Sequence, residues 1–159
     1  MGVVRRASAG DVEEVAACLR AAFAPYREQY TDGAYADTVP DLNGVAARLA
    51  SMVVFVAEDD DGAVVGTIGG ASSGGEGHIR GMAVLPRAQG SGVAARLLAA
   101  VEAALRERGC SIVSLDTTMP LARAIRFYER SGYRASGRVV DFFGMPLYEY
   151  RKRLEGGSP

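Results

Sequence analysis

The residues best suited to chemistry form a glycine-rich segment, Pro86-Arg87-Ala88-Gln89-Gly90-Ser91-Gly92-Val93-Ala94, between a predicted strand and a predicted amphipathic helix. Glycines allow close approach of the backbone, so amide N–H groups can point at an oxyanion, and the helix N-terminus adds about half a positive charge. This segment, the glycine turn, therefore predicts a phosphate-binding site. A plain turn with small residues for tight packing would explain a lone Gly-x-Gly equally well.

A dinucleotide site is a second interpretation of the same residues. Gly90-Ser91-Gly92-Val93-Ala94-Ala95 matches the G-x-G-x-x-A fingerprint, which would indicate an oxidoreductase. That fingerprint needs the first strand of a doubly wound sheet directly before it and a strand-end acid about 20 residues later. Here an antiparallel meander comes first, and Asp116, the nearest strand-end acid, lies beyond that spacing. Because no Gly-Lys-Ser/Thr is present, a Walker phosphate loop is excluded.

The elements that must position the glycine turn follow from hydrophobic periodicity. Helix 93–108 separates strand 78–85 from strand 111–118, so these two strands should pair in parallel. Asp11 and Glu14 have the spacing of a capping box at the start of the first helix. Residues 25–40 are predicted to be an aromatic loop. Further strands are expected over 3–7, 52–58, 63–71, 133–141 and 146–154, and further helices over 11–24, 41–50 and 120–130.

This element order predicts a mixed α/β fold: a six- to seven-stranded sheet with an antiparallel N-terminal meander, flanked by about four helices. The 159 residues, 48% hydrophobic and 23% charged, suit one domain over 1–154 with a flexible tail over 155–159. A net charge of -1 gives no excess positive field, so no nucleic acid partner is expected. Cys18 and Cys110 lack a metal or redox spacing, and no membrane or signal segment is evident. We therefore expect a soluble, cytoplasmic protein without a metal site.

At the glycine turn the sequence resembles the GCN5-related N-acetyltransferase (GNAT) superfamily. Gln89, Gly92 and Ala94 fill the signature Gln/Arg-x-x-Gly-x-Gly/Ala. The segment Ala124-Ile125-Arg126-Phe127-Tyr128-Glu129-Arg130-Ser131-Gly132-Tyr133 is similar to the family's later Ala-x-x-Phe-Tyr-x-x-x-Gly-Phe/Tyr element. The resemblance implies a splayed central pair of parallel strands and acetyl-CoA as cosubstrate. The implied contacts are backbone groups of Met82, Ala83 and Val84 for pantetheine, and of Gln89, Gly90, Ser91, Gly92, Val93 and Ala94 for pyrophosphate.

The resemblance also implies direct transfer of acetyl to a primary amine of a small molecule or protein in a ternary complex. Tyr128 occupies the position where a family tyrosine commonly protonates the leaving thiolate. His78 stands four residues before Met82, where the family often has a glutamate base, and Glu76 lies two residues further back on the same strand face. A packing tyrosine, a surface histidine and deprotonation by solvent are the alternatives.

Leu121 occupies the position of an asparagine that contacts the coenzyme in many family members. This departure keeps open a second function, a non-catalytic acyl-CoA-binding or interaction module. The resemblance implies acceptor selection by residues 26–41 and 141–148, and the final strands could pair two copies into a homodimer. Acids in the first segment could attract a polyamine, an aminoglycoside or a peptide N-terminus, or simply be solvated. These acids are Glu28, Asp32, Asp37 and Asp41.

Overall fold

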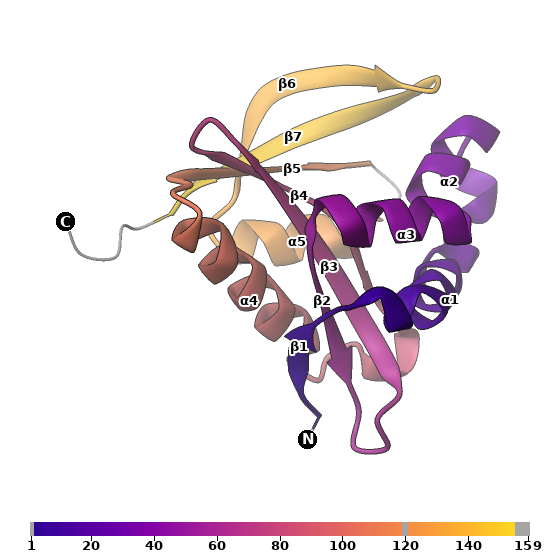
Figure 1. The fold of residues 1–159 in the computed structure, drawn as a ribbon. Coiled ribbons are helices and arrows are strands. Elements are labelled where there is room, and N and C mark those ends of the chain that lie inside the picture. Colours follow the sequence, from indigo (N-terminus) through magenta and orange to yellow (C-terminus); the bar gives the residue numbers. More distant parts are fainter. Residues whose placement is uncertain (1, 119–120, 155–159) are drawn as a thin grey trace.

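A seven-stranded mixed sheet lies at the centre of the fold, with helices on both faces (Figure 1). The computed structural model describes residues 2–118 and 121–154, so the predicted tail at 155–159 lies outside the described residues. The strands are β1 (Val4–Arg6), β2 (Val53–Glu58), β3 (Val64–Ser73), β4 (Glu76–Val84), β5 (Ile112–Thr117), β6 (Arg134–Phe142) and β7 (Met145–Arg153). The α-helices are α1 (Val12–Phe23), α2 (Asp32–Thr38), α3 (Leu42–Ser51), α4 (Val93–Glu107) and α5 (Ala122–Arg130), and the short 3-10 helices are η1 (Ala9–Asp11), η2 (Ala24–Gln29) and η3 (Pro86–Ala88).

The strand order is β1-β2-β3-β4-β5-β7-β6. Strands β2 to β4 form the predicted antiparallel meander, to which β1 adds antiparallel to β2, and β4 pairs with β5 in parallel, which confirms both predictions. The closing hairpin inserts β7 between β5 and β6, so β6 is an edge strand of the sheet. The sheet therefore reverses strand direction on both sides of the central parallel pair.

The parallel pair separates after four residue pairs. Pairing runs from Glu76 opposite Ile112 to Ile79 opposite Leu115 and extends no further within the described residues. Beyond this point, β4 contains a β-bulge: Thr67 of β3 faces Ala83, while Gly69 faces Arg80. The bulge spans 81–82, and its first residue, Gly81, has a φ of 71°, which favours glycine. The splay expected from the family resemblance is therefore present.

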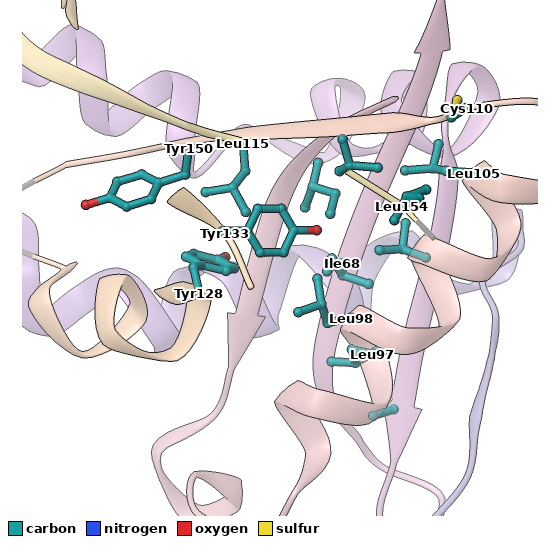
Figure 2. Packing of buried hydrophobic residues seen from close by; sticks show 14 of the residues in the cluster. Ile68, Leu97, Leu98, Leu105, Cys110, Leu115, Tyr128, Tyr133, Tyr150 and Leu154 are labelled. Atoms are coloured by element: carbon teal, nitrogen blue, oxygen red, sulfur yellow. The ribbon is translucent and has the colours of Figure 1, made fainter. Parts of the chain in front are cut away.

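Helices cover the sheet in two layers. Helix α4 approaches β3 closely, since a Cβ at Gly70 would lie 2.7 Å from Val101 and one at Gly66 would lie 2.9 Å from Leu97. Helices α4 and α5 belong to one buried cluster, part of which is seen in Figure 2. Helices α1 to α3 belong to a second cluster, on the other side of the sheet (Figure 1). The N-terminus of α4 is thereby held beside the end of β4.

Two local predictions were wrong. The segment 25–40 is not a loop, because it contains η2 and α2. Thr31 caps α2 by accepting a hydrogen bond from the Ala34 amide, and the buried Ala34 anchors that helix in the second cluster. The described residues consequently form five α-helices, one of which, α2, lies in the segment expected to be a loop.

The second wrong prediction concerns the first capping box. Asp11 does precede α1, but its side chain makes no cap there; its carboxylate instead belongs to a capping box with Ser8 at η1 and accepts a hydrogen bond from the Ser8 amide at 2.8 Å. The chain begins to coil one turn early, as η1, and Arg5 also donates to Asp11 at 2.9 and 2.8 Å. Glu14 instead accepts from the Val64 amide on β3.

None of the helices in the described part of the chain has the length and apolar character needed to cross a lipid bilayer. The same residues contain no group of three metal-ligating side chains.

Candidate active site

A cavity of about 640 Å³ lies where β4 and β5 separate. It extends from the glycine turn, past both strands, to side chains of η2, α2 and α3. Because it reaches residues from both helical layers, the splay connects the two faces of the sheet. Most of the site residues predicted from sequence line this cavity: His78, Met82, Ala83, Val84, Gln89, Gly90, Gly92, Ala94 and Tyr128. The other three predicted residues, Glu76, Ser91 and Val93, are outside the lining.

The glycine turn has the conformation expected of an anion-binding loop. Gly90 and Gly92 have φ values of 80° and 87°, and Gly92 is the N-cap of α4 without a side-chain cap. The first N–H groups of an α-helix have no partner within the helix, so they can bind a ligand here. The Ser91 hydroxyl donates to the Ala88 carbonyl, and the Gln89 amide donates to the Val84 carbonyl at 3.3 Å. These two side chains therefore brace the turn.

The β4 backbone beside the turn is open on one side. Ala83 and Val84 pair with β3, whereas pairing with β5 has ended at Ile79. A strand edge of this kind can bind the amides of an extended ligand as an additional strand would. The predicted pantetheine-binding segment, Met82 to Val84, therefore has backbone groups facing the cavity side of the splay.

Tyr128 lies beneath this edge on α5. Its side chain is buried, with 7% exposed, and its ring contacts that of Tyr133 edge-on at 5.9 Å between centroids (Figure 2). The hydroxyl donates to the Met82 sulfur at 3.2 Å. Burial raises the pKa of Tyr128, so the hydroxyl keeps its proton at neutral pH. Since a thioether is a weak acceptor, this proton is available to a stronger one.

A deeper network fixes the position of this tyrosine pair. The fully buried Tyr133 donates to the Glu102 carboxylate at 2.7 Å, and Lys152 from β7 contacts the same carboxylate at 3.1 Å. This network joins α4, the end of α5 and β7, and so holds Tyr128 in place.

His78 lies on the opposite face of the splay and has a partner at each ring nitrogen. Nδ1 lies 2.9 Å from the Ser114 hydroxyl, and Nε2 lies 3.4 Å from Oδ2 of Asp116. The Ser114 hydroxyl also lies 3.5 Å from the Gly77 carbonyl, so it can bridge that carbonyl and Nδ1, while Nε2 faces the carboxylate. Burial raises the pKa of Asp116, against the opposing effect of His78. The two groups are therefore placed to share a proton.

Asp116, which the sequence pattern did not identify as a partner of His78, is a functional candidate that only the structure reveals. The signal that could have found its role is parallel register: His78 faces Ser114, so Ser114 and Asp116 lie on the same face of β5 as the imidazole. Glu76, by contrast, is not brought into the cavity. Its carboxylate, 59% exposed, pairs with Arg151 of β7 at 2.6 Å.

Thr117 is a further residue that the sequence argument missed. It lines the cavity, is only 3% exposed, and its hydroxyl has no hydrogen-bond partner among residues 2–118 and 121–154. A buried hydroxyl without a partner costs about 1–3 kcal/mol. Together with the glycine turn and the open β4 edge, this orphan hydroxyl fits a cavity built to hold an extended polar ligand such as an acyl-CoA. No sequence signal singles it out, because threonine is common in strands.

The far half of the cavity is walled by aromatic and aliphatic side chains, including Tyr26, Tyr30 and Phe142. Leu121, at the position of the family's asparagine, also lines it. Of the four acids predicted to attract a cation, Asp37 is part of the lining and pairs with Arg80 at 3.1 Å. The other three, Glu28, Asp32 and Asp41, are outside the lining.

Comparison with known proteins identifies the family. The model of the acetyltransferase (GNAT) family matches residues 15–133. Aminoglycoside N(6')-acetyltransferase type 1 of Stenotrophomonas maltophilia is 33% identical over 126 residues, which cover 72% of this chain and 82% of that protein. A GNAT acetyltransferase structure from Staphylococcus aureus Mu50 superposes with a TM-score of 0.79 at 19% identity, covering 98% of this chain and 100% of that one.

A second solved structure, the PaiA N-acetyltransferase of Thermoplasma acidophilum in complex with coenzyme A, gives a TM-score of 0.79 at 15% identity over 97% of this chain and 99% of the other. At such identities the two structural matches establish the fold. The family match covers most of the chain, and acetyl-CoA is the cosubstrate of this family. This chain is therefore a member of the GNAT family of acetyltransferases.

Proposed function

We propose that this protein is an N-acetyltransferase that moves the acetyl group of acetyl-CoA to a primary amine by direct attack in a ternary complex. The observation that carries the proposal is the single cavity shared by the glycine turn, Tyr128 and the His78–Asp116 pair. A donor bound from one face of the splay and an acceptor bound from the other would meet between β4 and β5.

The coenzyme half of the proposal uses mainly backbone groups. N–H groups from Gln89 to Ala94 would bind the pyrophosphate, and the open edge from Met82 to Val84 would bind the pantetheine amides. The orphan hydroxyl of Thr117 would donate to a carbonyl oxygen of the same ligand. None of these contacts needs the asparagine that Leu121 replaces, so its loss is compatible with coenzyme binding.

Acetyl-CoA supplies an activated acyl group on a thiol leaving group. As the C–N bond forms and the C–S bond breaks, the His78–Asp116 pair would take the proton that the amine loses, and Tyr128 would give its proton to the departing sulfur. Glu76, held by Arg151, has no part in this scheme. Deprotonation of the amine by solvent would leave the role of Tyr128 unchanged.

The same proposal covers the remaining properties of the chain. We propose that residues 1–154 form one acetyltransferase domain. The two cysteines are free and buried, which supports a reducing, cytoplasmic location. The exposed edge strand β6 offers a surface for a homodimer. The aminoglycoside acetyltransferase relative supports a small-molecule amine as the acceptor.

A thiol-release assay tests the activity directly. The protein is incubated with acetyl-CoA and a panel of primary amines, and products are identified by a mass increase of one acetyl group. We expect amine-dependent release of CoA above the rate of hydrolysis. If the protein is instead a non-catalytic acyl-CoA-binding module, acetyl-CoA will raise its Tm, but no amine will accelerate thiol release.

A further inference from the structure

The charged residues that line the cavity are predominantly basic. Within the described residues there are two acids, Asp37 and Asp116, and each faces a basic side chain: Asp37 faces Arg80, and Asp116 faces His78. An acceptor with several positive charges would therefore meet unfavourable electrostatics. The arginines of the lining are Arg48, Arg80, Arg123 and Arg130.

Arg48 differs from Arg80 in lacking a carboxylate partner. It comes from α3 and donates from Nη2 to the main-chain oxygen of Asp37, at 2.7 Å, near the end of α2. Among the described residues, no carboxylate oxygen lies within 4.0 Å of the Arg48 guanidinium, so Arg48 forms no ion pair there. Burial and the neighbouring Arg80 lower the pKa of Arg48, and the charge of Asp37 only partly offsets them, as expected for a guanidinium whose charge is incompletely balanced.

The guanidinium of Arg48 lies beside the point where β4 separates from β5. A Cβ on Gly81 would lie 3.1 Å from Nη1 of Arg48, so the guanidinium sits over the β4 bulge, where β4 leaves β5. His78 and Arg80 precede the bulge on that same strand face. A planar guanidinium with free N–H donors matches the two oxygens of a carboxylate.

We propose that the acceptor is an amine that also carries a carboxylate, such as an amino acid, and that Arg48 binds this carboxylate while the amine faces His78 and Asp116. This inference rests on the proposed acetyl transfer and names the substrate class of the same site. The aromatic wall formed by Tyr26, Tyr30 and Phe142 would contact the apolar part of the acceptor.

Matched acceptors test the proposal with the wild-type protein. Amino acids are compared with their carboxamides, and spermidine and an aminoglycoside serve as cationic acceptors, all at saturating acetyl-CoA. We expect the highest kcat/KM for a carboxylate-bearing amine, with its carboxamide lower by about tenfold or more, because a charge-assisted hydrogen bond is lost. A preference for carboxamides, spermidine or the aminoglycoside overturns the proposal, as does failure to acetylate any amino acid when acetyl-CoA binds.

Variants of Arg48 locate the effect. Arg48→Gln should raise KM for the amino acid by about tenfold or more and leave the carboxamide unchanged, whereas Arg48→Lys should keep part of the preference. Arg20→Gln, which changes an exposed arginine of α1 outside the cavity lining, is the matched control and should change kcat/KM for neither acceptor. Equal losses on both acceptors in Arg48→Gln contradict the assignment. Absence of acetyl-CoA binding in the wild type would instead refute the proposed function itself.

Discussion

Nε2 of His78 lies 3.4 Å from Oδ2 of Asp116, while Nδ1 of the same ring lies 2.9 Å from the Ser114 hydroxyl. A base whose two nitrogens are both engaged acts together with its partners, so in the proposed mechanism the proton acceptor is the pair and not the imidazole alone. Both side chains remain partly exposed toward the cavity, His78 to 41%. This arrangement gives the first prediction.

Asp116→Asn should lower kcat/KM and not destabilise the protein at pH 7. Burial raises the pKa of Asp116, and Glu149 adds to this, while His78, Arg138 and Arg80 oppose it. A raised folded-state pKa means that Asp116 stabilises the fold below its unfolded pKa of about 3.9 and loses this contribution as pH rises through the folded value. The ionised carboxylate therefore costs stability at pH 7, and the neutral amide does not.

The measurement is Tm at pH 7 and pH 4, together with kcat/KM, for Asp116→Asn and for Asp61→Asn, an exposed acid in the β2–β3 turn. We expect the Tm of Asp116→Asn to equal or exceed that of the wild type at pH 7, with a smaller difference at pH 4, and kcat/KM to fall by about tenfold or more. A lower Tm with unchanged kcat/KM would make Asp116 a purely structural residue.

Thr117→Val should stabilise the free protein and weaken acetyl-CoA binding. The substitution replaces a buried hydroxyl that has no partner in the described structure with a methyl group of similar size. We expect a gain of about 1 kcal/mol in the free energy of unfolding and a rise in Kd of about three- to tenfold. Thr117→Ser should keep the wild-type affinity.

Thr67→Val is the matched control for this prediction. Thr67 is equally buried, but its hydroxyl donates to the Phe55 carbonyl at 3.0 Å. Removing that bond should lower the Tm and leave the affinity for acetyl-CoA unchanged. If Thr117→Val also lost stability and kept its affinity, the hydroxyl would have no ligand role.

Gly92→Val should damage acetyl-CoA binding far more than Val93→Ile. Gly92 has a φ of 87°, where a β-branched residue is strained by about 1–2 kcal/mol, although a Cβ there would meet no atom within 4 Å. The turn can relieve this strain only by moving the N–H groups at the start of α4. Calorimetric titration of both variants decides the point, and similar affinities would place the phosphate site elsewhere.

Tyr128→Phe should reduce kcat by about a hundredfold while Kd for acetyl-CoA and Tm stay close to wild type. The hydroxyl makes one weak bond, to the Met82 sulfur, so its loss should cost little stability. Tyr133→Phe offers the contrast: it lies outside the cavity lining and loses a bond to the buried Glu102, so it should lower Tm. Unchanged kcat in Tyr128→Phe would exclude this tyrosine as the acid.

The sequence was sufficient for those parts of the fold that depend on local pattern. The β2–β3 hairpin, α4 and the parallel pairing of β4 with β5 follow from alternation, four-residue spacing and element order, and all three are present. Helix α2 was missed because its stability depends on burial of Ala34 against residues far along the chain. The β4 bulge has a sequence signal, which is the glycine Gly81 in the interior of the strand.

The site shows the same limit. His78 and Glu76 lie two residues apart on the same face of one strand and could not be distinguished by spacing, but Arg151, far away in sequence, pairs with Glu76. The roles of Asp116 and Thr117 depend on where β5 separates from β4, which only the three-dimensional register defines. Long-range pairing, rather than residue type, decides these assignments.

Calorimetric titration with acetyl-CoA, with NADH as the control ligand, tests the central claim most directly, because it asks whether the cavity between β4 and β5 binds the coenzyme before any acceptor is known. We predict one site per chain with Kd in the micromolar range, about -8 kcal/mol, and no heat from NADH. Absence of acetyl-CoA binding, or binding of NADH in its place, would contradict the account.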